Sequence, residues 1–264
     1  RHKWNPLYYK NDYADWIKRW LYYSFVTLTE RKALRKLTGL SANSNATAET
    51  VSKAYDIPPE KIKTVYLGLD LDCVPIDDQL EKERLHRPTL LLVGGNVQRK
   101  GLPVILKTMP ELLKEIPGLT LQVIGNNQNL GKMKKLVHQL GIGESVEFLG
   151  WIYPEKIKNY YRKACVFVMP SLMEGFGLVF LEAMAQGLPI IGGNVGGTLE
   201  LIEDGANGFL VNPGDVGTLG KKIRESIVNL DLRRQVIENG YSTVQKYSRQ
   251  KMINDTIELY KEFI

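Results

Sequence analysis

The sequence predicts an α/β fold with a doubly wound parallel sheet. From residue 89 to residue 245, short apolar runs rich in β-formers alternate with helical patterns about ten residues long. This alternation is typical of βαβ units, whose crossover helices cover the faces of a parallel sheet. Five of the six expected strands also end in glycine-bearing loops. Such loops let ligand atoms approach the backbone at the carboxyl edge of the sheet.

The individual elements follow from local patterns. Strands are expected at 90–93, 119–124, 145–149, 165–169, 189–191 and 209–211. Helices are expected at 103–116, 132–140, 155–163, 178–186, 198–202, 215–230 and 251–263. The residues before this sheet predict a strand end at 39–44, a helix at 47–55 and a strand at 64–67. The polar stretch 71–88 that follows is predicted to be a linker.

Composition excludes several classes of protein. With 44% hydrophobic and 24% charged residues, the chain is neither disordered nor collagen-like. Cys73 and Cys165 are too few for a disulfide framework, and three scattered histidines predict no metal site. No apolar run approaches the roughly 20 residues that span a bilayer, and no signal peptide opens the chain. We therefore expect a soluble, cytoplasmic protein.

The net charge of +6 comes entirely from residues 1–40, which hold nine basic and three acidic residues. The same segment holds nine aromatic residues, among them Trp4, Trp16 and Trp20. A basic, aromatic helix can lie on an anionic membrane surface or bind a nucleic-acid backbone. Alternatively, most of these aromatic side chains pack into a core while the cations face water.

Two strand-end loops carry the strongest chemical signals. The loop after residue 93 places Gly94, Gly95, Arg99 and Lys100 beside the start of a helix, where an anion would bind; the alternative is a solvated pair of cations. It matches neither a Walker A sequence nor a dinucleotide fingerprint.

The loop after residue 169 brings a carboxylate, Glu174, to the start of the next helix. The free N–H groups of Gly177, Leu178 and Val179 would hold a phosphate there, while Glu174 and Glu182 accept hydrogen bonds from sugar hydroxyls. In the alternative interpretation, Glu182 satisfies the helix terminus and Glu174 is merely exposed.

The segment Glu174-Gly-Phe-Gly-Leu-Val-Phe-Leu-Glu182 resembles the Glu-x7-Glu motif of retaining nucleotide-sugar glycosyltransferases with the GT-B fold, of the family-4 type (glycosyl transferases group 1). The resemblance extends from about residue 40 to residue 262. It includes Val146-Glu-Phe-Leu-Gly150, Lys100-Gly101, Val168-Met-Pro-Ser, Gly187-Leu-Pro-Ile-Ile, Gly196-Gly197-Thr-Leu-Glu200, Asp204-Gly-Ala-Asn-Gly and Pro213-Gly-Asp.

The resemblance implies that Glu182 holds the ribose hydroxyls and Glu174 the donor sugar, with Glu174 and Lys100 as catalytic residues. Lys100 and the N–H groups of Gly177 and Leu178 would take the diphosphate, so that no metal or other cofactor is required. The implied donor is a UDP-sugar, with a GDP-sugar as the alternative. The implied donor-binding residues are Gly94, Gly95, Arg99, Lys100, Asn126, Ile152, Glu174, Gly175, Phe176, Gly177, Leu178, Val179 and Glu182.

The resemblance also implies a domain organisation. Residues 1–70 correspond to the latter part of an N-terminal, acceptor-side domain, and residues 71–88 to a linker. Residues 89–245 correspond to the Rossmann-like donor domain, and residues 246–264 to a C-terminal helix that packs back toward the N-terminal segment. Most of an acceptor domain is therefore missing from the chain.

Two positions depart from the family pattern or extend it. Many relatives have Arg where this chain has Gly95, and Arg99 is a candidate to replace that charge. His2 lies about as far before Ser41 as an active-site histidine does in some relatives, although a surface histidine near a chain end is the alternative.

The leading hypothesis is a glycosyltransferase that transfers a sugar with retention of configuration to an acceptor, with a lipid-linked acceptor as one candidate. The alternative is a non-catalytic, membrane-associated module that binds nucleotide sugars. A nucleic-acid partner is not expected, because residues 41–264 are neutral overall and contain no recognition motif. The resulting prediction is a cytoplasmic protein that can bind peripherally to the inner face of the cell membrane.

Overall fold

The computed structural model describes residues 26, 28–70, 72–75, 77–125 and 130–262. The chain divides into two compact units. Of the described residues, 26, 28–66 and 254–262 belong to the smaller unit, and those between 67 and 253 belong to the larger unit. The last helix, α11 (Arg249–Lys261), runs from the larger unit into the smaller one.

The larger unit is built on a six-stranded sheet with the order β5-β4-β3-β6-β7-β8. All neighbouring strands pair in parallel. The strands are β3 (Thr89–Val93), β4 (Thr120–Ile124), β5 (Val146–Gly150), β6 (Val166–Met169), β7 (Ile190–Gly193) and β8 (Phe209–Val211). This is the order of a doubly wound, Rossmann-like sheet, so the predicted fold class is confirmed.

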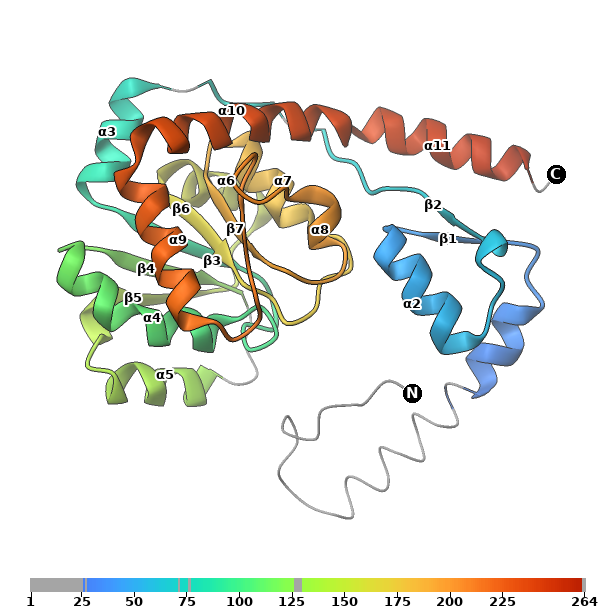
Figure 1. Ribbon diagram of the computed structural model, residues 1–264, viewed down its shortest axis with the longest axis horizontal. Helices are drawn as coiled ribbons and strands as arrows, with labels where there is room; N and C mark the ends of the chain where they lie inside the picture. Colours follow the sequence, from blue (N-terminus) through green and yellow to red (C-terminus); the bar gives the residue numbers. More distant parts are fainter. Residues whose placement is uncertain (1–25, 27, 71, 76, 126–129, 263–264) are drawn as a thin grey trace, which may run out of the picture. The chain divides into compact units, whose positions relative to one another are not determined.

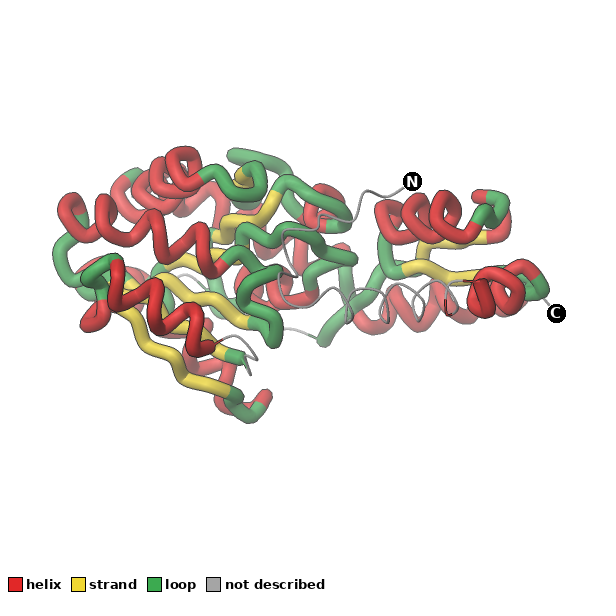
Figure 2. The backbone as a smooth tube through the Cα atoms, turned by 90° about the horizontal axis from the view of Figure 1, so that it is seen from below, coloured by secondary structure: helices red, strands yellow, loops and turns green. Residues whose placement is uncertain are grey.

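Helices cover both faces of this sheet (Figures 1 and 2). The helices that follow β3 and β4, α4 (Leu102–Glu115) and α5 (Leu130–Gln139), lie below it in Figure 1. Helix α7 (Leu178–Ala185), which follows β6, lies above the sheet in that view, and the short helix α8 (Thr198–Leu201) follows β7. The connection from β5 to β6 contains α6 (Pro154–Lys163), and the short η3 (Gly143–Ser145) precedes β5. Because both faces are covered, the central strands β3 and β6 are continuous apolar runs.

Two helices close the larger unit where the sequence predicted one. Helix α9 (Val216–Val228) ends before Asn229, whose side chain accepts a hydrogen bond from Leu232 N–H at 3.1 Å and caps the next helix, α10 (Leu230–Lys246). Helix α10 was not predicted. Its buried residues include Arg233, Gly240 and Thr243, so its inner face lacks a purely apolar stripe.

The stretch predicted as a linker contains a helix, α3 (Asp78–His86). The side chain of Asp77 caps it by accepting hydrogen bonds from the N–H groups of Gln79 and Leu80. Its mean composition is polar, but Arg84 on its inner face is buried. Composition alone therefore gave the wrong local structure for residues 78–86.

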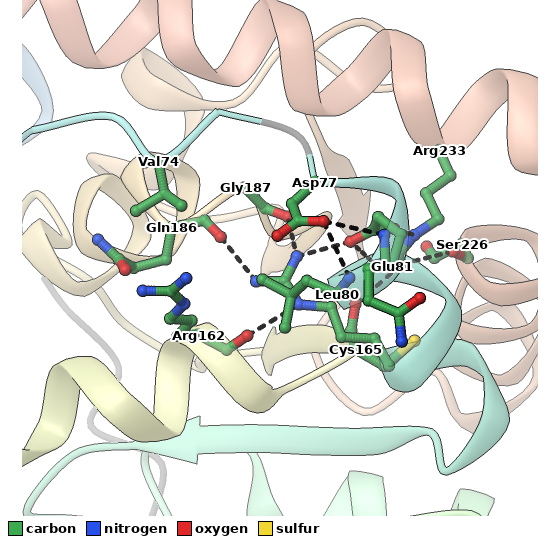
Figure 3. Close-up of polar contacts among 12 residues, drawn as sticks. Val74, Asp77, Leu80, Glu81, Arg162, Cys165, Gln186, Gly187, Ser226 and Arg233 are labelled. Atoms are coloured by element: carbon green, nitrogen blue, oxygen red, sulfur yellow. Dashed lines mark hydrogen bonds and ion pairs between the residues drawn. The ribbon is translucent and has the colours of Figure 1, made fainter.

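A buried ionic cluster anchors α3 (Figure 3). The carboxylate of Glu81 accepts hydrogen bonds from Arg84 Nη1 at 2.6 Å and from Arg233 Nε at 2.6 Å. Arg233 Nη2 adds a longer hydrogen bond to Glu81 Oε1 at 3.3 Å. Both guanidinium groups also donate to backbone carbonyls, Arg84 to those of Arg162, Gln186 and Gly187 and Arg233 to those of Cys165 and Ser226. Burial alone raises the pKa of Glu81, but the two arginines outweigh it and hold this pKa below the usual carboxyl value.

The smaller unit contains a two-stranded parallel sheet of β1 (Leu40–Ala42) and β2 (Ile62–Thr64). Between them lie α2 (Asn45–Tyr55) and the single turn η2 (Pro59–Lys61). Ala42, Ile57 and Ile62 form its buried core. The predicted strand at 64–67 is wrong in position, since pairing ends at Thr64.

Candidate functional site

The strand order reverses between β3 and β6, and this reversal locates the candidate site. From the centre of the sheet, β3, β4 and β5 follow one another toward one edge strand, whereas β6, β7 and β8 follow one another toward the other edge strand. In open α/β sheets, ligands bind beyond the carboxyl ends of the strands at this switch point. The two loops that flank it are residues 94–101 and residues 170–177, which are the two loops selected from the sequence.

Backbone contacts hold these loops together. The N–H of Leu172 donates to the carbonyl of Arg99 at 2.8 Å. Gly101 adopts a φ of 87°, and a Cβ there would lie 2.2 Å from the carbonyl oxygen of Pro170. Only glycine fits this close approach. These backbone contacts therefore hold the loop of residues 94–101 against the loop that contains Glu174.

Lys100 and Glu174 form an ion pair at the centre of the site. Lys100 Nζ lies 2.5 Å from Glu174 Oε2, and the two side chains are 11% and 10% exposed. The Lys100 stem runs past Gly94, where a Cβ would lie 3.2 Å from Lys100 Cγ. The arrangement therefore presents a cation and a carboxylate side by side, one for an anionic group and one for a hydrogen-bond donor.

Arg99 does not share this position. Its Nη1 donates to the carbonyl of Met173 at 2.8 Å, which supports the neighbouring loop. Gly95 is exposed, and no heavy atom of the described residues lies within 4 Å of a Cβ placed there. The two adjacent cations predicted from the sequence thus take different roles, because Lys100 pairs with Glu174 and Arg99 binds backbone.

The start of α7 lies next to this ion pair. Gly177 is the N-cap with a φ of 100°, and no side chain caps the helix. The first N–H groups of a helix have no acceptor within it, so those near Leu178 and Val179 are suited to an anion. Phe176 has a different role, because its ring is buried and packs edge to face on Tyr247 at 5.4 Å. Gly175, before it, is half-buried.

Glu182 lies one turn further along α7 and has a partner that the sequence did not reveal. Tyr161 Oη, on α6, donates to Glu182 Oε2 at 2.8 Å. Burial raises the pKa of Glu182, and the hydrogen bond from Tyr161 opposes that rise. The pKa of Tyr161 is raised well above its usual value, first by burial and then by the charge of Glu182.

Ile152 follows β5 and is half-buried, between Trp151 and Tyr153. These two exposed rings meet edge to face, with centroids 4.5 Å apart. Asn126 and His2, the other two predicted residues, lie outside the described part of the chain. Of the predicted site residues, the structure therefore brings together those on the loops of Lys100 and Glu174.

The loop after β7 supports the site and was not predicted to do so. Gly197 N–H donates to the carbonyl of Glu174 at 3.0 Å. A Cβ at Gly197 would lie 2.1 Å from the carbonyl oxygen of Gly175. The signal in the sequence was the pair Gly196-Gly197, since adjacent glycines often mark a close backbone approach.

Among the described residues, no group of three or more His, Cys, Asp or Glu side chains is arranged to hold a metal ion. Within the same ranges, no helix is long and apolar enough to cross a membrane.

Comparison with known proteins agrees with the resemblance seen in the sequence motifs. The model of the family "Glycosyl transferases group 1" matches residues 75–243. An uncharacterised glycosyltransferase of Methanocaldococcus jannaschii is 28% identical over 250 residues, which are 88% of this chain and 64% of that protein. D-inositol 3-phosphate glycosyltransferase 2 of Catenulispora acidiphila is 33% identical over 196 residues, which are 68% of this chain and 46% of that protein.

Solved structures agree on the fold. Sucrose-phosphate synthase of Thermosynechococcus elongatus has a TM-score of 0.77 at 25% identity, covering 90% of this chain and 61% of its own. Anabaena HepE, solved with UDP-glucose, has a TM-score of 0.77 at 22% identity, covering 87% of this chain and 65% of its own.

The chain spans between 40% and 64% of the length of the curated relatives it matches. The family match covers β3 to β8 and includes every described site residue discussed above. With its six-stranded parallel sheet and its two facing loops, this chain belongs to the glycosyl transferases group 1 family.

Proposed function

We propose that this chain is the donor-binding half of a glycosyltransferase that uses a nucleoside-diphosphate sugar and retains the configuration of the transferred hexosyl group. The observation that carries the proposal is the Lys100–Glu174 ion pair at the switch point of the sheet, beside the start of α7. A diphosphate needs cations and N–H donors, and a sugar needs hydrogen-bond acceptors. The pair supplies a cation and an acceptor within one site.

The proposed roles follow from these positions. Lys100 and the first N–H groups of α7 hold the diphosphate and stabilise the charge that grows on it as the sugar leaves. Glu174 accepts hydrogen bonds from the sugar hydroxyls, and Glu182 accepts them from the ribose. In this scheme the acceptor hydroxyl attacks from the face that the diphosphate leaves, and its proton passes to a diphosphate oxygen. Lys100 and the helix terminus supply the stabilisation that a divalent metal gives in other transferases, so we propose that donor binding requires no metal.

The donor is proposed to be a UDP-sugar, with a GDP-sugar as the alternative. Anabaena HepE has been solved with UDP-glucose, and a relative from Mycobacterium tuberculosis, 30% identical over 153 residues, is named as GDP-mannose-dependent. Isothermal titration of the chain with UDP, UDP-glucose, GDP and GDP-mannose, each with and without EDTA, tests the proposal. We expect one nucleotide series to bind equally in both conditions. Absence of binding in every series, or binding that EDTA abolishes, would contradict it.

A non-catalytic nucleotide-sugar-binding module would give the same titration result. The two functions differ in turnover. Incubated with a sugar nucleotide and an acceptor, an enzyme releases the nucleoside diphosphate from the sugar nucleotide, whereas a binding module leaves the sugar nucleotide intact.

A lipid-linked acceptor and a cytoplasmic, peripheral membrane location are part of the same proposal. The mycobacterial relative is named as a phosphatidylinositol monomannoside mannosyltransferase. The basic segment 1–40 would contribute about 1 kcal/mol per exposed cation near an anionic surface. Lys10, Lys18 and Arg19 lie outside the described residues, Lys32 is exposed, and Arg31 pairs with Asp56 at 2.8 Å.

Sedimentation with vesicles tests the membrane proposal. We expect binding to anionic vesicles at low salt, release at high salt, and loss of binding when the basic residues of this segment are replaced by Ser. Equal binding to neutral and anionic vesicles, or binding to neither, would contradict it.

A further inference from the structure

Tyr161 is almost fully buried, yet its hydroxyl reaches the Glu182 carboxylate of the site. Tyr161 as a residue is 2% exposed, and its Oη lies 2.8 Å from Glu182 Oε2. The tyrosine comes from α6 and the glutamate from α7, so the bond joins two helices that flank β6 in the sequence.

An aromatic cluster fixes the position of this hydroxyl. The Tyr161 ring packs on Phe167 of β6 with centroids 5.7 Å apart. Phe167 in turn meets Phe180 of α7 edge to face, at 5.6 Å and 90°. Both phenylalanines are fully buried. Because close-packed rings in a core have little freedom to move, the Tyr161 hydroxyl is a fixed donor rather than an adaptable one.

A fixed donor on one carboxylate oxygen has a defined consequence for the other. An ionised carboxylate offers about four acceptor positions on two oxygens. Tyr161 occupies one position on Oε2 and thereby restrains the rotation of the Glu182 carboxylate. Oε1 and the free lone pair of Oε2 then point in a constant direction, which suits two neighbouring hydroxyls such as those of a ribose.

We propose that Tyr161 is a positioning residue for nucleotide recognition, which holds the Glu182 carboxylate in the orientation that accepts hydrogen bonds from both ribose hydroxyls. The inference rests on the proposed function, since it assumes that Glu182 faces the ribose. The chemistry of the environment agrees with it. Burial disfavours the ionised form of Glu182, and the Tyr161 hydrogen bond counteracts this and preserves an acceptor.

The test compares ribose discrimination in Tyr161→Phe and in the wild type. Phenylalanine retains the ring packing on Phe167 and removes only the hydroxyl. The readout is the ratio of the dissociation constants of 2′-deoxy-UDP and UDP, measured at 10 °C so that moderately destabilised variants remain folded. If GDP is the nucleotide that binds, the guanine pair is used instead. We expect the ratio to fall by about three- to tenfold in Tyr161→Phe, because the carboxylate no longer favours the orientation that accepts both hydroxyls.

Two controls make the result specific to Glu182. Tyr160→Phe removes a hydroxyl from the neighbouring position of α6 but leaves the Tyr161–Glu182 bond in place, so the ratio should stay at the wild-type value. In a Glu182→Ala background the ratio should already be low, and Tyr161→Phe should change it no further.

The outcomes separate the inference from the function on which it rests. A wild-type ratio in folded Tyr161→Phe would overturn the positioning role, as would an equal fall in Tyr160→Phe. Failure of the wild-type chain to bind either nucleotide would instead overturn the proposed function. A loss of thermal stability with an unchanged ratio assigns Tyr161 a purely structural role and therefore also overturns the inference.

Discussion

Replacing Arg233 by Met should strongly destabilise the larger unit. The Arg233 side chain is 2% exposed and donates to Glu81 at 2.6 Å through Nε and to the carbonyls of Cys165 and Ser226 at 2.9 and 3.0 Å. Methionine has an unbranched stem that can follow the path of the arginine, so the change removes the charge and the donors while filling most of the space.

The magnitude follows from what remains after the change. Removing one partner of a buried ion pair typically destabilises a protein by about 3–5 kcal/mol, since the other charge stays buried. Here Glu81 retains Arg84, which donates to it at 2.6 Å. We therefore expect the lower end of this range, about 3 kcal/mol, part of which arises from the two carbonyls that lose their donor.

Urea unfolding of the wild type, Arg233→Met and Arg234→Met measures this difference. Arg234 is adjacent on α10 and exposed, so its replacement should change the free energy of unfolding by about 0.5 kcal/mol or less. The slope of the transition should stay constant, because the same surface is exposed on unfolding. A destabilisation below about 1 kcal/mol in Arg233→Met would refute the argument that burial makes this cluster strong.

Three other predictions concern the site and the cluster. Glu182→Ala should weaken nucleotide binding by about 10–100-fold, as expected for losing one or two charge-assisted hydrogen bonds, and unchanged affinity in a titration would remove its ribose role. Gly197→Ala should displace the Glu174 loop, because its Cβ would lie 2.1 Å from the Gly175 carbonyl oxygen. We therefore expect a lower affinity for the sugar nucleotide in a titration, and an affinity equal to that of the wild type would contradict this. The lowered pKa of Glu81 means that its stabilising contribution is present above the ordinary carboxyl pKa and is lost as pH falls through the lower folded value. Acid unfolding followed by circular dichroism should therefore be less steep in pH for Glu81→Gln, and identical profiles would be evidence against this linkage.

Much of the sheet and part of the site could be predicted from the sequence because their signals are local. Strands β3 and β6 each contain a run of four buried apolar residues. The Lys100 loop and the Glu174 loop each follow such a strand directly. Since parallel strands end at one edge of a sheet, neighbouring loops had to meet there.

Helices α3 and α10 escaped prediction because their buried faces are partly charged. Arg84 and Arg233 are typical surface residues in a sequence, and they are buried here only because Glu81 lies between them. Glu81 and Arg233 are 152 residues apart, so no local pattern indicates the pair. The energetic reason is that a buried charge is tolerated only with a partner, and partners are set by the fold.

The sequence by itself determined the class of the fold and the two loops that carry charge, because periodicity and glycine spacing act over a few residues. The family was indicated by the resemblance of its motifs, above all the segment from Glu174 to Glu182. Only the tertiary structure decided how individual side chains are used. In the folded chain Lys100 forms an ion pair with Glu174, and Arg99 donates a hydrogen bond to a backbone carbonyl. Tyr161, on a different helix, donates a hydrogen bond to Glu182. These choices depend on packing directions and on contacts between distant segments, which a pattern along the chain does not contain.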